Sequence, residues 1–160
     1  ADPKENIVVI PALTGLGAPH WKPDVRGAIF GLTRDSTLKD IVKGTVQSIV
    51  FQADDLCQAM HQDSGLAIPS VRVDGGLVES RYFCQFLSKM MGGDIIVPQS
   101  HECSAIGAAM AAGLSIGIVS SLAAISQLWQ SRAHYTPQML TGDVAQYRAR
   151  WKAALAQLLP

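Results

Sequence analysis

The segment VRVDGGLVESRYFCQFLSKMMGGDIIVP, residues 71–98, decides the fold. It contains a strand, a helix and a second strand, which we expect at Val71–Val73, Glu79–Met91 and Asp94–Val97. The helix should bury one apolar side, formed by Tyr82, Phe86, Leu87, Met90 and Met91. A strand–helix–strand unit of this kind closes through a right-handed crossover with parallel strands. The sequence therefore predicts an α/β fold in which helices cover a small sheet.

Further elements are expected on both sides of this unit. Two short strands, Ile7–Ile10 and Ala28–Phe30, flank a structured loop over residues 12–26. A long helix follows, with a capping box at Thr37 and Asp40 and a C-cap at Gly65. Its buried face is predicted from helical spacing as Val42, Val46, Ile49, Val50, Ala53, Leu56, Cys57 and Met60. Three more helices are expected at Ser104–Ala112, at Ser120–Gln130 and from about Thr141 onward.

The small-residue helix Ser104–Ala112, closed by Gly113, is interpreted as a buried helix and not as a membrane span. Its Ala and Gly side chains leave so little bulk that another backbone element could pack very close to it. Near the end of the chain, Trp129, Tyr147 and Trp151 are expected in the core. The last helix should bury one face made of Val144, Tyr147, Trp151, Ala154, Leu155 and Leu158.

Composition narrows the classes of function. The chain has 160 residues, zero net charge, 48% hydrophobic residues and 16% charged residues. These values fit one globular domain, and they argue against disorder, nucleic-acid binding and attachment to a membrane surface. Cys57, Cys84 and Cys103 are odd in number and far apart, which predicts neither a disulfide framework nor a zinc site and favours a reducing, cytoplasmic compartment. The four histidines are scattered, so no metal site is expected.

Asp74-Gly75-Gly76 is the first candidate site, because it joins a strand to a helix through a glycine turn. Glycine lets the backbone approach a ligand closely, and a helix N-terminus favours anionic or polar groups. The alternative is a plain connection between strand and helix, and the residues alone leave it open. The loop Thr14–Arg26 is a second candidate, which Trp21, Asp24 and Arg26 could hold by stacking and an ion pair. A rigid connection without ligand contact is equally compatible with that loop.

Four segments, in this order along the chain, resemble the FGGY family of carbohydrate kinases: Pro11–Arg34, Gly27–Gln47, Val71–Gly76 and Ser104–Gly113. The first of them is most similar to the members that phosphorylate glycerol. The resemblance implies an actin/hexokinase-like (ribonuclease H-like) ATPase domain, present here in part, with ATP and Mg²⁺ as cofactors. It also implies that Gly75, Gly76 and Ser80 border the adenosine pocket. Ser80 stands where these kinases usually carry an Asn, Gly44 where the signature has Ala or Ser, and Lys22 where an Asp is usual.

The same resemblance predicts that residues 1–160 belong to the C-terminal, nucleotide-binding domain. The catalytic aspartate, the polyol-binding residues and the metal-holding carboxylates would lie in an N-terminal substrate domain that this chain lacks. We therefore expect no catalytic or metal-binding residue here and no kinase activity from the chain alone. The expected ligands are ATP or ADP, with glycerol or a related polyol held by the other domain, in a homo-oligomer. Three alternatives stay open: another FGGY sugar kinase, a non-catalytic actin-like nucleotide-binding module, and a doubly wound α/β domain without nucleotide.

Overall fold

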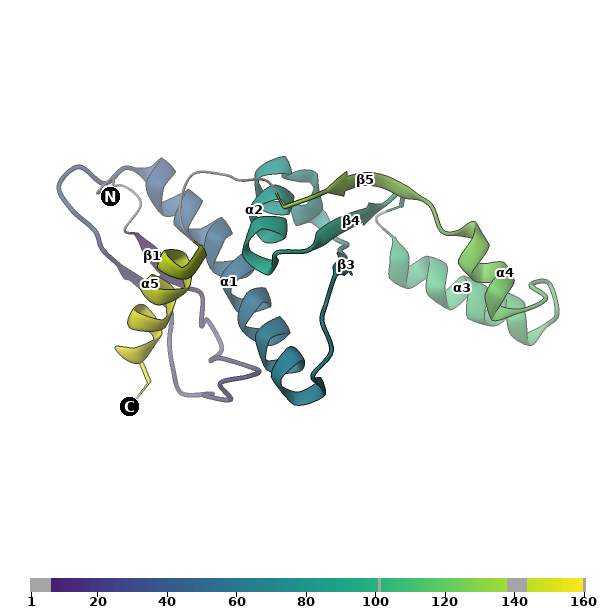
Figure 1. The fold of residues 1–160 in the computed structure, drawn as a ribbon, viewed down its shortest axis with the longest axis horizontal. Helices are drawn as coiled ribbons and strands as arrows, with labels where there is room; N and C mark the ends of the chain where they lie inside the picture. Colours follow the sequence, from purple (N-terminus) through teal and green to yellow (C-terminus); the bar gives the residue numbers. More distant parts are fainter. Residues whose placement is uncertain (1–6, 101, 138–143, 160) are drawn as a thin grey trace.

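The computed structural model describes residues 7–100, 102–137 and 144–159. Figure 1 shows a body formed by two small sheets and three helices, from which a pair of helices projects as an arm. The elements, in chain order, are β1 (Val8–Ile10), β2 (Ala28–Phe30), α1 (Leu38–Ser64), β3 (Ser70–Arg72), the 3₁₀ turn η2 (Gly76–Glu79), α2 (Arg81–Met91), β4 (Asp94–Pro98), α3 (Cys103–Ser115), α4 (Leu122–Leu128), β5 (Ser131–Tyr135) and α5 (Val144–Ala156).

The sheets confirm the predicted topology. β3 and β4 pair in parallel, with Val71 opposite Ile95, and α2 is the crossover between them. β1 and β2 form a separate antiparallel pair, with Val9 opposite Ile29. The sequence did not predict β5, which pairs antiparallel with β4 and completes a three-stranded sheet of order β3-β4-β5.

Both predicted ends of α1 are confirmed. The backbone N–H and the hydroxyl of Thr37 donate to one carboxylate oxygen of Asp40, at 2.9 and 2.6 Å. At the other end, Gly65 adopts the left-handed conformation, with φ of 68°, and donates its N–H to the carbonyl of His61 at 2.8 Å. These local signals fix where the helix starts and stops.

The predicted buried face of α1 is partly wrong. Val50 is buried as expected, but Val42, Leu56 and Met60 are exposed. The residues that α1 buries are Gly44, Gln47, Ser48, Val50, Phe51 and Asp54. The helix is rotated from the prediction because the polar members of this face have partners inside the fold, as in the 2.8 Å hydrogen bond from the Gln47 amide to the Tyr82 hydroxyl.

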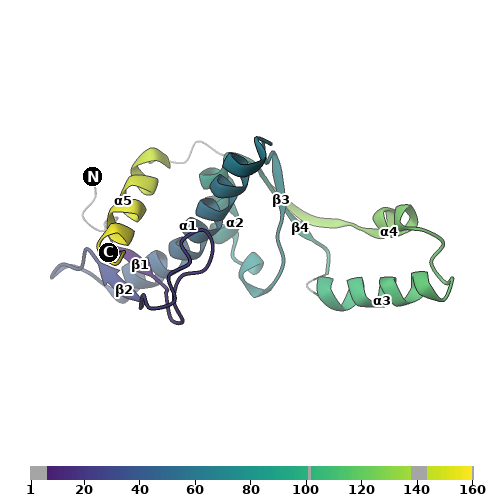
Figure 2. The same ribbon diagram turned by 90° about the horizontal axis from the view of Figure 1, so that it is seen from below.

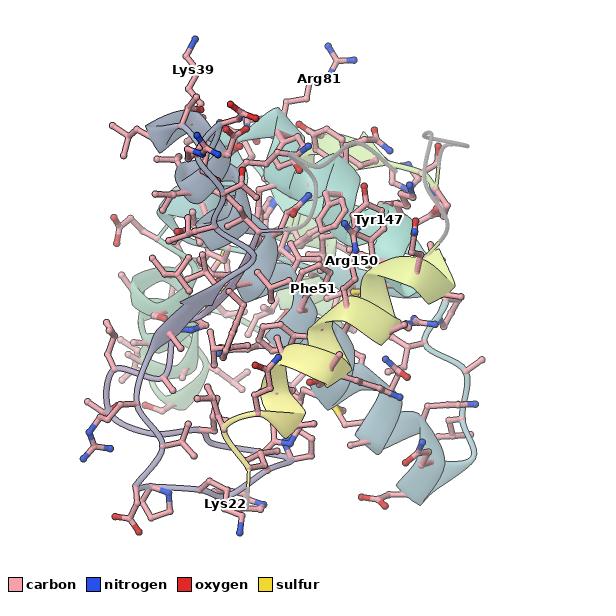
Figure 3. The ribbon with its side chains drawn as sticks, turned by 90° about the vertical axis from the view of Figure 1, so that its left-hand side faces the viewer. Lys22, Lys39, Phe51, Arg81, Tyr147 and Arg150 are labelled. Carbon is pink, nitrogen blue, oxygen red and sulfur yellow. The ribbon has the colours of Figure 1, made fainter. Side chains whose placement is uncertain are left out.

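Aromatic side chains fill the core between α1, α2 and α5. The ring of Phe51 lies 5.8 Å from that of Phe86 and 5.3 Å from that of Trp151, and Phe86 meets Tyr147 edge-on at 5.2 Å. The rings of Phe51 and Tyr147 are 6.3 Å apart, and the guanidinium of Arg150 lies 4.8 Å from the Tyr147 ring centre; all three residues are labelled beside α5 in Figure 3. Tyr147 and Trp151 are therefore core residues, as predicted. The predicted start of this helix at Thr141 lies outside the described residues.

On α2, Phe86, Leu87 and Met90 are buried as predicted, whereas Tyr82 is exposed and Met91 is half-buried. The prediction that Trp129 belongs to the core is wrong. It lies half-buried at the base of the arm, where the guanidinium of Arg72 stacks over its ring at 4.0 Å.

The interpretation of residues 104–112 as a buried helix is also wrong. α3 and α4 lie side by side and project away from the body in both views (Figures 1 and 2). Within α3 only Gly113 is buried, and the helix continues through it to Ser115. Ala and Gly have little apolar surface to bury, so the pair gains little from packing on the body. No described helix is long and apolar enough to cross a membrane.

Candidate functional site

The glycine turn follows the carboxyl end of β3 and is open to solvent. Gly75 has φ of 95° and ψ of 179°, a backbone region that is essentially restricted to glycine. Its N–H donates to the carboxylate of Asp74 at 2.7 Å. A Cβ added at Gly75 or Gly76 would meet no atom within 4 Å. Within the described residues the Gly76 N–H has no hydrogen-bond partner, so it is available to a ligand.

The sequence predicted that the glycine turn leads directly into the helix, and this prediction is wrong. Residues Gly76–Glu79 form one turn of 3₁₀ helix, and α2 begins at Arg81 and not at Glu79. Val78 anchors this turn: its side chain is buried, and its carbonyl accepts a hydrogen bond from the Cys84 thiol at 3.4 Å. The exposed glycines are therefore held by a buried residue two positions after Gly76.

Ser80 is the N-cap of α2. Its hydroxyl oxygen accepts the N–H of Phe83 at 3.2 Å, and the residue is half-buried. The oxygen is therefore engaged in the fold, whereas the hydroxyl proton can still be donated. A serine here cannot present the donor and acceptor that an amide offers together.

Two further contacts fix the turn from outside. Arg132 on β5 pairs with Glu79 at 2.8 Å. Cys103, the first residue of α3, donates its thiol to the carbonyl of Ser100 at 3.5 Å and lies near the carboxylate of Asp74. The interaction with Asp74, together with burial, raises the pKa of the Cys103 thiol above its ordinary value. Sequence reasoning missed Cys103 and Arg132, because their contacts join segments that are distant in the chain.

A cavity of about 510 Å³ lies beside the turn, at the base of the arm. Its apolar lining comes from α3, α4 and the residue after α4, and includes Ile106, Met110, Ile125, Leu128 and Trp129. Arg72 on β3 and Cys103 on α3 also line it. Gly75, Gly76 and Ser80 do not line this cavity.

The chemistry available at the turn is binding and positioning. It offers a free backbone donor, a carboxylate and a capped helix. The described part of the chain brings together no group of three His, Cys, Asp or Glu residues that could hold a metal ion. A metal-assisted step is therefore not assigned to these residues.

The prediction for the second candidate, the loop Thr14–Arg26, is wrong in its details. Trp21 is 74% exposed and does not stack, and Arg26 donates to the carbonyls of Pro23 and Val25 instead of pairing with Asp24. The loop is held by other contacts. Leu16 and Lys22 exchange two backbone hydrogen bonds of 2.9 Å. His20 lies 3.1 Å from the carboxylate of Asp55 on α1.

The mixed small sheets and the crossover helix define an α/β fold of the actin/hexokinase-like class. Residues 1–116 match the model of the FGGY family of carbohydrate kinases, C-terminal domain. The chain belongs to this family.

Comparisons with individual proteins agree. The chain is 40% identical over 154 residues to a glycerol kinase of Geobacillus sp. (strain WCH70) and 41% identical over 153 residues to one of Ectopseudomonas mendocina (strain ymp). Each alignment covers 96% of this chain but 31% of the relative, so the chain spans about a third of these relatives.

Among solved structures, the glycerol kinase of Plasmodium falciparum with ADP matches 100% of this chain and 32% of its own length, with a TM-score of 0.85 and 29% identity. A xylulose kinase from Lactobacillus acidophilus matches 98% of this chain and 31% of its own, with a TM-score of 0.79. At 20% identity, that second likeness shows the fold alone.

Proposed function

We propose that this chain forms the adenosine side of the nucleotide site in a glycerol kinase, which converts ATP and glycerol to ADP and glycerol 3-phosphate. All of residues 1–160 would belong to the C-terminal domain. The observation that carries the proposal is the open Gly75–Gly76 bend at the end of β3, with an unpartnered backbone N–H and no side chain above it. The ADP-bound relative of the same fold supports a nucleotide ligand.

In this proposal Gly75 and Gly76 let the nucleotide approach the backbone, and Gly76 donates its N–H. The Ser80 hydroxyl proton is a further donor close to the bend in the sequence. Phosphoryl transfer depends mainly on positioning and electrostatic stabilisation, so binding residues are a real part of catalysis. Mg²⁺ would neutralise phosphate charge when bound, but the described residues do not form a site for it. We propose that the catalytic base and the metal ligands belong to the other domain of the kinase.

Glycerol is the substrate that the comparisons favour. The glycerol kinases are about 40% identical over 96% of the chain, whereas the xylulose and gluconate kinases of known structure share 20%. We further propose a homo-oligomeric, cytoplasmic enzyme, in line with the three free cysteines.

Binding of ADP tests the proposed site. Gly76→Val should leave the fold intact, because a Cβ there meets nothing, but its branched side chain would occupy the nucleotide's side of the bend. We expect calorimetry to show ADP binding to the 160-residue chain and loss of that binding in Gly76→Val. Gly17→Val is the matched control, since Gly17 also has open space around its Cβ and lies in a different loop. Equal ADP affinity in Gly76→Val and wild type would refute the proposed site.

Measurements of kinase activity test the proposed location of catalysis and the proposed substrate. The 160-residue chain should not phosphorylate glycerol, and turnover by the purified chain would refute the assignment of catalysis to another domain. The full reading frame that encodes this chain should be assayed with ATP and a panel of polyols and ketoses. Preference for another sugar would overturn the glycerol assignment. ATP binding without turnover of any sugar would favour a non-catalytic module.

A further inference from the structure

A cavity with polar walls lies between the loop Thr14–Arg26 and α1. Its volume is about 310 Å³, so it could hold about ten water molecules at about 30 Å³ each. Its lining consists of Pro11, residues 14–20, Gln52 and Asp55. None of Gly75, Gly76 and Ser80 belongs to this lining, so the nucleotide site proposed above gives the cavity no role.

A buried carboxylate in the cavity wall has one oxygen without a partner. The Asp55 side chain is 10% exposed, and Oδ2 makes both of its contacts. The Trp151 indole N–H donates to Oδ2 at 2.6 Å, and His20 Nε2 lies 3.1 Å from it. Within the described residues nothing is hydrogen-bonded to Oδ1. A buried acceptor that stays unpaired costs free energy, so Oδ1 favours a ligand that donates to it.

The other polar groups of the cavity include both donors and acceptors. The Gln52 amide and the Thr14 hydroxyl have no hydrogen-bond partner in the part of the chain that the structure describes. The same is true of the second ring nitrogen of His20 and of the backbone N–H groups of Gly17 and Ala18. An amide or a hydroxyl offers a donor and an acceptor together. A ligand that satisfies these groups must therefore donate and accept at neighbouring positions.

We propose that this cavity binds a small uncharged polyol or sugar. Hydroxyl groups on adjacent carbons can donate to Asp55 Oδ1 and accept from the Gln52 amide at the same time. A phosphate or a carboxylate would meet the negative charge of Asp55. An amine could pair with Asp55, but it has nothing with which to accept from Gln52 or from the backbone N–H groups. The proposal does not depend on the nucleotide function proposed above.

The walls of the cavity are held in place without a ligand. Gly15 has φ of 95°, and a Cβ there would lie 2.6 Å from the Cα of Pro23, so the loop folds closely on itself. Leu16, which is 6% exposed, anchors the loop in the core. On the other wall, the buried Trp151 fixes the Asp55 carboxylate. A site that is already formed loses little conformational entropy when it binds a ligand.

Titration with ribitol tests the proposal, with two-dimensional amide NMR of the 160-residue chain as the measurement. We expect millimolar binding that shifts the amides of Gly15, Gly17 and His20. Gln52→Ala should leave the fold intact, because Gln52 is half-buried and its side chain makes no hydrogen bond in the described structure. It should weaken ribitol binding about three- to tenfold, the equivalent of one hydrogen bond. Gln62→Ala is the matched control, since Gln62 is exposed on the same helix and does not line the cavity.

Two further arms test the class of ligand and the second wall. Thr14→Val keeps the shape of the side chain but removes its hydroxyl, and it should also weaken ribitol binding. Putrescine and inorganic phosphate should leave the loop amides unshifted, and shifts as large as those with ribitol would overturn the polyol assignment. The site itself would be overturned if ribitol, glycerol and glucose all failed to shift these amides at tens of millimolar, or if Gln52→Ala bound ribitol like wild type. None of these results bears on ADP binding, which Gly76→Val tests separately.

Discussion

At the scale of single residues, an ion pair between Asp54 and Arg148 joins two segments of the body that are distant in the chain. Two guanidinium nitrogens of Arg148 donate to the two carboxylate oxygens, each at 2.8 Å. Arg148 also donates to the carbonyl of Met90 at 2.8 Å, and Gln58 donates to Asp54 at 2.6 Å. The hydrogen bond with Asp54 raises the pKa of Arg148, and burial opposes this shift. The pair therefore fastens α5 to α1 and to the end of α2.

Removing Arg148 should reduce the free energy of unfolding more than removing Asp54. The Asp54 side chain is 4% exposed and that of Arg148 is 35% exposed. Arg148→Ala would leave a buried carboxylate without its counter-charge, and we expect it to reduce the free energy of unfolding by about 3 kcal/mol. Asp54→Ala should cost less, about 1–2 kcal/mol, because Arg148 can turn toward water. Urea denaturation measures both. Arg81, which points away from the body in Figure 3, provides a control variant, Arg81→Ala, with little expected change. A smaller loss in Arg148→Ala than in Asp54→Ala would contradict this account.

At the scale of elements, features that depend on neighbouring residues were predicted correctly from the sequence. Features that depend on contacts between distant segments were not. The ends of α1 follow from Thr37, Asp40 and Gly65, whose effects act within one turn of helix. Its rotation depends on partners such as Arg148, which lies far along the chain. β5 was missed because Ser131–Tyr135 has no clear alternation of apolar residues, and its pairing with β4 defines it.

The candidate site also has features that local sequence predicts and features that it does not. The sequence predicted a glycine turn after a strand, since Asp-Gly-Gly interrupts both strand and helix. It did not predict the intervening η2 turn or the capping role of Ser80, because the helix could start at several neighbouring residues. The ion pair of Arg132 with Glu79 depends on how the chain returns from the arm to pair β5 with β4, and no local pattern encodes it. Whether Gly75, Gly76 and Ser80 bind a nucleotide remains a proposal.

Two glycines in different elements should respond oppositely to alanine. At Gly93, a Cβ would lie 2.9 Å from the carbonyl oxygen of Pro69, so the chain before β3 would have to move. We expect Gly93→Ala to destabilise the chain by about 2 kcal/mol. At Gly107, on the exposed α3, a Cβ meets nothing. Gly107→Ala should be neutral or should stabilise by up to about 1 kcal/mol through helix propensity. Thermal unfolding measures both, and destabilisation by Gly107→Ala would show that its face is covered in the isolated chain.

At the scale of the whole molecule, the structure divides into a packed body and a thinly packed arm. The largest fully buried side chains, which include Trp151, Met90 and Ile95, all belong to the body. In the arm, α3 buries Gly113 alone and α4 buries no residue. Stability should therefore be lower in the arm than in the body.

Hydrogen exchange should reveal this difference. Elements with few buried contacts open with a smaller free energy than the core, so their amides exchange sooner. In the 160-residue chain, peptides from α3 and α4 should exchange at least about tenfold faster than peptides from α2. Mass spectrometry of a time course of exchange would measure both in one sample. Equal protection of α3 and α2 would show that the arm is as stable as the core.

The three tryptophans each lie in a different environment. Trp151 is 1% exposed, against the ring of Phe51, and donates its indole N–H to Asp55 at 2.6 Å. The ring of Trp129 stacks against the Arg72 guanidinium at the base of the arm, and Trp21 is exposed to solvent on the loop Thr14–Arg26. Indole emission shifts to longer wavelength as the ring becomes hydrated. The molecule thus contains three natural optical probes, and single-tryptophan versions would report separately on unfolding of the body, movement of the arm and contacts of the loop.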